Sequence, residues 1–97
     1  MLLMDRENLF KPGWSHVLST TNDLLELEEL RIRVGAPRRA FHLSDGRPHL
    51  DLKLEPRDRA LQDPAVTVVE TSRELILWWR ASQAASTKRD APHPAGQ

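Results

Sequence analysis

The sequence predicts a single small α/β domain in which strands and helices alternate along the chain. Two observations carry this prediction. Residues 49–54 alternate polar and apolar side chains strictly, which is the period-two pattern of a β-strand. Residues 24–34 repeat apolar side chains at helical spacing, between a capping aspartate and a glycine. An α+β arrangement is the alternative.

Short apolar runs and capping residues place the first half of the elements. Met1–Met4 is expected to form a buried strand, and Trp14–Ser19 a second strand. The first helix begins after Asp23, with Glu26 three residues on as in a capping box, and it ends at Gly35. The apolar stripe of this helix is formed by Leu24, Leu27, Leu30 and Val34.

The second half continues the alternation. Arg38–Leu43 is expected to be extended, and the Asp-Gly turn in residues 44–48 would join it to the strand His49–Leu54 as a hairpin. A short helix is expected at Arg57–Gln62 and a strand at Ala65–Val69. Thr71 and Glu74 form a second capping box, which opens the last helix.

The predicted order of elements is therefore β-β-α-β-β-α-β-α, in a mixed sheet. Residues 1–81 would form the domain. Residues 82–97 contain few apolar side chains and are expected to be a disordered tail. One buried cluster is expected to form the core, from Leu27, Leu30, Val34, Leu50, Leu52, Val66, Val68, Leu75 and Ile76.

Composition excludes several classes of function. The chain has 97 residues, enough for one small domain, and carries 14 basic and 14 acidic residues. Non-specific nucleic-acid binding is therefore not expected, because it draws on an excess of positive charge. Without cysteine there is no disulfide, thiolate nucleophile or zinc–sulfur site. No apolar run reaches the roughly 20 residues that span a bilayer, so we expect a cytoplasmic protein without membrane contact.

Polar residues on strand faces and at element ends form the candidate site. His49 and Asp51 lie two positions apart on one strand face, close enough to act as an acid–base or metal-binding pair. His16, on an earlier strand, could be a ligand or a general base. Asp5 follows the first strand, at the end where α/β sheets bind ligands. Arg57, near a helix start, could bind phosphate.

These five residues are expected to converge on one concave surface. The catalytic candidates are His16, His49 and Asp51, and the ligand-binding candidates are Asp5 and Arg57. No metal ligand is assigned, although a divalent metal is left open as a cofactor.

Each candidate also has a purely structural interpretation. His16 could be a half-buried strand histidine bonded to a backbone carbonyl, and Asp5 could cap backbone N–H groups of a loop. Any alternating strand needs a polar face, which would account for His49 and Asp51. His42 receives only a structural interpretation. Of the neighbours Trp78 and Trp79, which point about 100° apart on a helix, one is expected to pack inside.

Several short motifs follow one another along the chain. An apolar strand ends at Asp5, and Trp14-Ser15-His16 follows. A leucine-rich helix ends at Gly35, His49-Leu50-Asp51 comes next, and Arg73-Glu74-Leu75 opens the last helix. In this order and spacing the motifs resemble a small bacterial and phage family catalogued as domain of unknown function 4031. The resemblance covers roughly residues 1 to 80.

The chain departs from that family's pattern at two places. Arg6 stands where the family has a second acidic residue, and Pro64-Ala65 replaces its usual Gly-Ala before the last strand. The arginine-bearing short helix of the family is matched by Arg57–Leu61. Because the family has no assigned activity, the resemblance implies the fold and the site more than a function.

Three functions are left open, and with them whether the chain is an enzyme. The first is binding of a nucleotide or another phosphorylated or anionic small ligand, with or without turnover. The second is a metal-dependent hydrolase or nuclease, because histidine and aspartate can hold a divalent ion without sulfur. Its residues would be Asp5, His16, His49 and Asp51. The third is a non-catalytic phage or bacterial interaction module that contacts a host protein.

Overall fold

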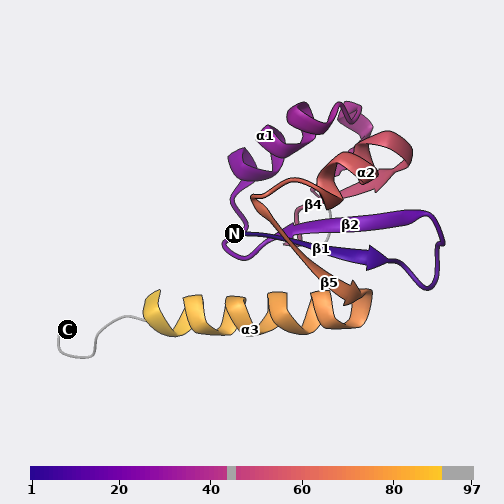
Figure 1. Cartoon of the computed structure of the whole chain (residues 1–97). Helices are drawn as coiled ribbons and strands as arrows, with labels where there is room; N and C mark the ends of the chain where they lie inside the picture. Colours follow the sequence, from indigo (N-terminus) through magenta and orange to yellow (C-terminus); the bar gives the residue numbers. More distant parts are fainter. Residues whose placement is uncertain (44–45, 91–97) are drawn as a thin grey trace, which may run out of the picture.

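The computed structural model describes residues 1–43 and 46–90, in which five strands form one mixed sheet with helices on both faces (Figure 1). The sheet order is β3-β4-β2-β1-β5. The edge strand β5 runs parallel to β1, and the remaining neighbours are antiparallel. The strands are β1 (Leu2–Glu7), β2 (Trp14–Ser19), β3 (Phe41–His42), β4 (His49–Lys53) and β5 (Val66–Thr71).

The helices form a layer on each side of this sheet. Figure 1 shows α1 (Leu24–Val34) and α2 (Leu54–Leu61) above the strands and α3 (Ser72–Asp90) below them. A 3-10 turn, η1 (Arg38–Ala40), precedes β3. The element order and the mixed sheet agree with the sequence prediction, so the α/β fold is confirmed. Ser44 and Asp45 of the predicted hairpin turn lie outside the described residues.

Helix α1 shows how local chemistry sets the boundaries. The Asp23 carboxylate accepts hydrogen bonds from the backbone N–H groups of Leu25 (3.0 Å) and Glu26 (3.2 Å), as expected for an N-cap. Gly35 ends the helix at φ 78°, a left-handed conformation that costs glycine no Cβ clash. The Glu26 carboxylate lies 3.2 Å from the amino group of Met1, so it ties the helix to the start of β1.

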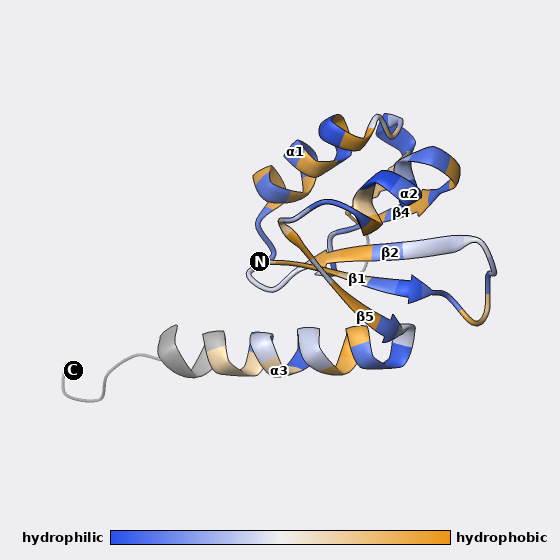
Figure 2. Cartoon of the chain, viewed as in Figure 1, coloured by the Kyte–Doolittle hydropathy of each residue, from blue (hydrophilic) through white to orange (hydrophobic). Residues whose placement is uncertain are grey.

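The sheet has an apolar core on each face, so the prediction of one cluster is wrong. Alternation along β1 sends Leu2 and Met4 toward α1 and α2, and Leu3 toward α3. Figure 2 shows the apolar residues in the first half of β1 and the last half of β2, with polar residues at the opposite end of both strands. The smaller core, on the α3 face, contains Leu3, Leu18, Val69 and Leu75, with Ile76 and Trp79 packed against it.

Two leucines expected on the apolar faces are exposed. Leu54 is 73 % exposed, because the chain leaves β4 through a left-handed residue there, at φ 56°. Leu24 is 48 % exposed in the first turn of α1. In contrast, Leu50 and Leu52 are buried in the core beneath α1 and α2, as the strand alternation predicts.

Helix α3 is longer than expected, which corrects the predicted boundary at residue 81. Residues 82–90 continue the helix, because they contain helix-forming Ala, Gln, Lys and Arg without glycine or proline. The Gln83 amide also donates to the Thr20 carbonyl (2.8 Å) and accepts from Asn22 (3.1 Å). Residues 91–97 of the predicted tail lie outside the described residues.

The two tryptophans of α3 differ as predicted. Trp79 packs on the smaller core and donates from Nε1 to Asn22 Oδ1 (3.1 Å), whereas Trp78 is exposed. Across residues 1–43 and 46–90, no helix has the length and apolar character needed to cross a membrane.

Candidate metal centre

Four of the predicted site residues lie on the α3 face of the sheet. Because Leu50 and Leu52 occupy the other face of β4, alternation places His49 and Asp51 on the α3 face. In the register of β2 and β4, His16 lies directly opposite Asp51. Asp5, on the neighbouring strand β1, is hydrogen-bonded to His16. These four residues therefore lie together on one face of the sheet, with Asp5 buried beneath the others.

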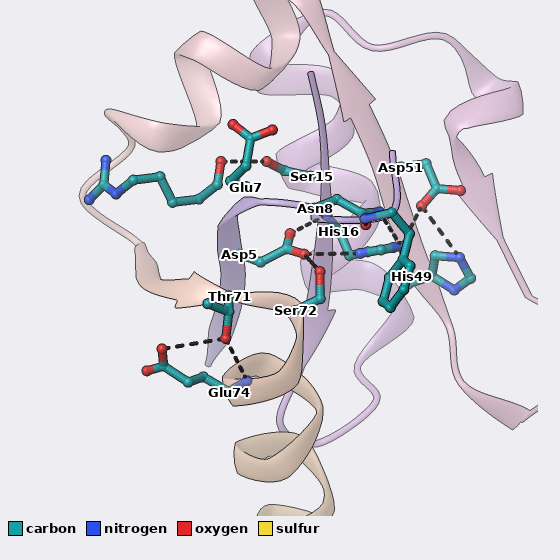
Figure 3. A network of polar contacts seen from close by, with 12 residues as sticks. Asp5, Glu7, Asn8, Ser15, His16, His49, Asp51, Thr71, Ser72 and Glu74 are labelled. Atoms are coloured by element: carbon teal, nitrogen blue, oxygen red, sulfur yellow. Dashed lines mark hydrogen bonds and ion pairs between the residues drawn. The ribbon is translucent and has the colours of Figure 1, made fainter. Parts of the chain in front are cut away.

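Asp5 is fully buried and accepts three hydrogen bonds (Figure 3). The donors are the His16 backbone N–H (2.5 Å), His16 Nδ1 (3.1 Å) and the Ser72 hydroxyl (2.5 Å). Burial alone raises the pKa of Asp5, but these donors outweigh it and hold the pKa below its ordinary value. Asp5 is therefore an ionised acceptor at neutral pH, and the Nδ1 atom of His16 carries the proton.

This arrangement leaves Nε2 as the nitrogen of the neutral His16 ring that carries a lone pair. The Asn8 side-chain amide lies 3.5 Å from Nε2 and can donate to its lone pair. On the open side, Nε2 is 3.6 Å from Asp51 Oδ1, and the His16 side chain is 34 % exposed. Asp5 and His16 thus form an oriented carboxylate–imidazole pair whose reactive nitrogen points toward Asp51 and solvent (Figure 3).

Asp51 lies at the centre of three imidazoles. His42 Nε2 is 3.2 Å from Asp51 Oδ2, and the Nε2 atoms of His49 and His16 are each 3.6 Å from Oδ1. Burial raises the pKa of Asp51, yet the adjacent histidines, His49 above all, lower it below its ordinary value overall. The contact with Asp51 in turn raises the pKa of His49, against the opposing effect of burial. The site therefore attracts positive charge.

The His49 ring is held in one orientation by the backbone. Its Nδ1 atom lies 2.9 Å from the Arg47 carbonyl, which can only accept, so Nδ1 donates and Nε2 faces Asp51. The His42 ring stacks on the His49 ring, with centroids 5.1 Å apart and planes at 15°. Hairpin pairing of β3 with β4 brings these two residues opposite one another.

His42, His49 and Asp51 could together hold a metal ion. Each offers one donor atom, and the three atoms lie within 4.8 Å of one another. Donors bound to one zinc ion lie about 3.4 Å apart, as follows from zinc–ligand bonds of about 2.1 Å in tetrahedral geometry. Small side-chain rotations that move the donor atoms by about an ångström would therefore bring all three within bonding distance of one ion.

Sequence reasoning missed three members of this site. His42 was read as structural, although extending the predicted hairpin would have placed it beside His49. Asn8 and Ser72 are not singled out by the sequence, because nothing in the local pattern distinguishes them from ordinary polar residues.

Arg57 does not belong to this site. It lies on the opposite face, where its Nε donates to the Ser15 hydroxyl (2.8 Å) and its guanidinium also contacts the Arg6 carbonyl and Glu7. Ser15 pairs with Leu52 in register and shares its face, which places Arg57 beneath α2. The arginine thus ties α2 to the end of β1.

No family model, curated protein or solved structure matches the chain. The resemblance to domain of unknown function 4031 stays a prediction.

Proposed function

We propose that this chain is a divalent-metal-dependent hydrolase whose ion is held by His42, His49 and Asp51. The observation that carries the proposal is the convergence of two imidazole nitrogens on one carboxylate, next to the Asp5–His16 pair. Three nitrogen and oxygen ligands with an open position are typical of catalytic zinc sites. The sequence-based alternative used Asp5, His16, His49 and Asp51 for this chemistry. In the present proposal His42 joins the metal ligands, His16 is a base and Asp5 orients it.

The surroundings of His49 and Asp51 support their assignment as metal ligands. Metal-binding histidines usually donate their other ring nitrogen to a carbonyl or carboxylate, which fixes the ring and its tautomer. His49 does so toward the Arg47 carbonyl. Asp51 is ionised, because its pKa is low, so it is ready to bind a cation without first losing a proton.

His16 is the general base in this proposal. An ion held by His42, His49 and Asp51 would lower the pKa of a water bound to it, and the neighbouring His16 imidazole could then accept the proton of that water. In hydrolysis, the water oxygen forms the new bond to the substrate as the bond to the leaving group breaks. The water proton would pass to His16 Nε2, and the imidazolium would then give a proton to the leaving group. The buried Asp5 carboxylate stabilises the imidazolium that forms.

The position of His16 and His49 on the same face of the sheet favours the hydrolase proposal over the interaction-module alternative. A histidine pair on opposite faces would have favoured a chain that acts only through partners. Instead, the ring centroids of His16 and His49 lie 6.0 Å apart, within reach of one small ligand. A common small-molecule site therefore has direct geometric support.

Zinc titration by calorimetry, with melting temperature as a second readout, tests the metal site. Zn²⁺ is expected to bind the full chain with one-to-one stoichiometry and to raise its melting temperature, since an ion that binds only the folded state stabilises it. His49→Ala and Asp51→Asn should abolish both effects. Asp58→Asn, which removes an exposed carboxylate on α2, should change neither.

His16→Ala separates the base from the ligands. This variant should keep Zn²⁺ affinity within a few-fold of the original and lose turnover of a chromogenic ester by about 10²-fold or more. Loss of zinc binding in His16→Ala would make His16 a ligand and remove it as the base. Unchanged zinc binding in Asp51→Asn would refute the metal site itself.

A further inference from the structure

A cavity of about 430 Å³ adjoins the candidate metal centre and shares His42 and Asp51 with it. This volume lies in the range of small-molecule sites. The cavity exists because β3 is short: it pairs only with His49 and Leu50 of β4. In the described part of the chain, no strand covers the outer edge of β4 from Asp51 to Lys53. The cavity lies along this open stretch and reaches the metal ligands.

The rim of the cavity carries unbalanced positive charge. Lys11, Arg39 and Lys53 line it, and Asp51 is its one acidic lining residue. Among the described residues, none of these three cations forms an ion pair with a carboxylate. A metal ion bound at Asp51 would offset the single negative charge. The cavity is thus suited to a ligand with more than one negative charge.

The remaining wall is apolar and aromatic. Trp14 presents its indole ring, over which Lys11 Nζ and Lys53 Nζ lie 4.1 and 4.8 Å from the ring centroid. Leu52 and Pro56 add aliphatic surface from β4 and α2. A flat heterocycle that stacks on this ring would take the place of a lysine ammonium, which is then available to bind the phosphate. The wall and the rim therefore fit two different parts of one ligand.

From this juxtaposition we propose that the cavity binds a nucleotide, with its phosphate toward His42 and Asp51 and its base against Trp14. The inference rests on the proposed hydrolase, for which it names the substrate class as a phosphate ester of a nucleoside. The reaction would be addition of water at phosphorus, with cleavage of the phosphorus–oxygen ester bond and release of the nucleoside hydroxyl. The three cations would hold the phosphate oxygens during this step.

Calorimetric titration of zinc-loaded protein with adenosine monophosphate, adenosine and inorganic phosphate tests the substrate class. Adenosine monophosphate should bind at least about tenfold more tightly than either fragment, because it alone fills both parts of the cavity. Arg39→Gln and Lys53→Gln should each weaken its binding about tenfold by removing one charged contact. Arg38→Gln is the matched control, since Arg38 is exposed and lies outside the cavity lining, and it should change binding less than twofold.

Zinc titrations of the same variants separate this inference from the proposed function. Normal zinc binding with no preference for the monophosphate over adenosine would overturn the nucleotide assignment and leave the metal site standing. An equal loss of nucleotide affinity in Arg38→Gln and Arg39→Gln would also overturn it. If zinc does not bind, the metal-free protein is titrated with adenosine monophosphate. Binding that Arg39→Gln weakens would support the nucleotide site, and absence of binding would refute it.

Discussion

His16 and Asp51 are direct partners across β2 and β4, with Nε2 of the histidine 3.6 Å from Oδ1 of the aspartate. Each of the two side chains also contacts residues that the other does not. Asp5 holds His16, while His42 and His49 approach Asp51. The register of one strand pair thus joins the Asp5–His16 pair to the three residues that we propose as metal ligands. A slip of one residue in β4 would send Asp51 to the face covered by α1 and α2 and separate the two.

Asp5→Asn should lower the free energy of unfolding at neutral pH. It should also make this free energy depend less on pH in the acid range. The folded pKa of Asp5 lies below its unfolded value near 3.9, so the unfolded chain binds more protons in acid. The stabilisation is full above the unfolded pKa and is lost as pH falls through the folded pKa. Urea unfolding should show a cost of about 1–3 kcal/mol at pH 7, from the impaired buried hydrogen bonds. This cost should shrink below about pH 4. A cost independent of pH would contradict the ionised state of Asp5.

Leu27→Ala in α1 should lower the free energy of unfolding by about 2–5 kcal/mol, because Leu27 is fully buried in the core and its loss leaves a cavity. Leu25→Ala is the matched control on the same helix. Leu25 is 66 % exposed, so its truncation should cost less than about 0.5 kcal/mol. Similar losses in the two variants, measured by chemical denaturation, would show that α1 packs through another face.

Gly35→Ala should destabilise the chain by about 1–2 kcal/mol, since the residue sits in the left-handed region at φ 78°. A Cβ there would also lie 3.1 Å from Arg59 Nη1. Gly13→Ala provides the comparison, because Gly13 has φ 87° and open space around its Cβ position. The melting temperature should fall at least as far for Gly35→Ala as for Gly13→Ala, and the reverse order would argue against the Arg59 contact.

Gln83→Ala should lower stability by about 1 kcal/mol, because it removes hydrogen bonds from α3 to Thr20 and Asn22. Arg80→Ala, an exposed position on the same helix, should have little effect. Amide hydrogen exchange would add a local readout, with faster exchange expected around residues 80–85 in Gln83→Ala alone. Equal exchange in both variants would mean that α3 is not docked through Gln83.

The sequence predicted the order of elements because each long element has a clear period or cap. The strict alternation of residues 49–53 and the Asp23 cap both appear in the structure as expected. The core was harder to predict, because alternation assigns leucines to faces of a strand without saying that both faces are covered. Leu75 of α3 lies in the core between α3 and the sheet, and the sheet separates it from Leu50.

The site was predicted in part, for a related reason. Strand alternation alone brings His49 and Asp51 to one face. His16 joins them only through the pairing of β2 with β4, which the sequence pattern does not supply. His42 depends on a two-residue strand, which is too short to show a period. Arg57 was placed from a helix start alone. Because α2 covers the leucine face of β4, its arginine is carried to the opposite side from the histidines.

The shortness of β3 has a consequence for solubility. Unpaired backbone groups along a strand edge invite pairing with a second chain, and proteins guard such edges with charged side chains. The stretch of β4 that pairs with no strand on its outer side carries Asp51 and Lys53, with Lys11 close by around the same cavity. The charges that we assign to ligand binding would therefore also repel strand addition. Neutralising them together is expected to promote self-association at this edge, so the residues that we propose for ligand binding would also limit aggregation.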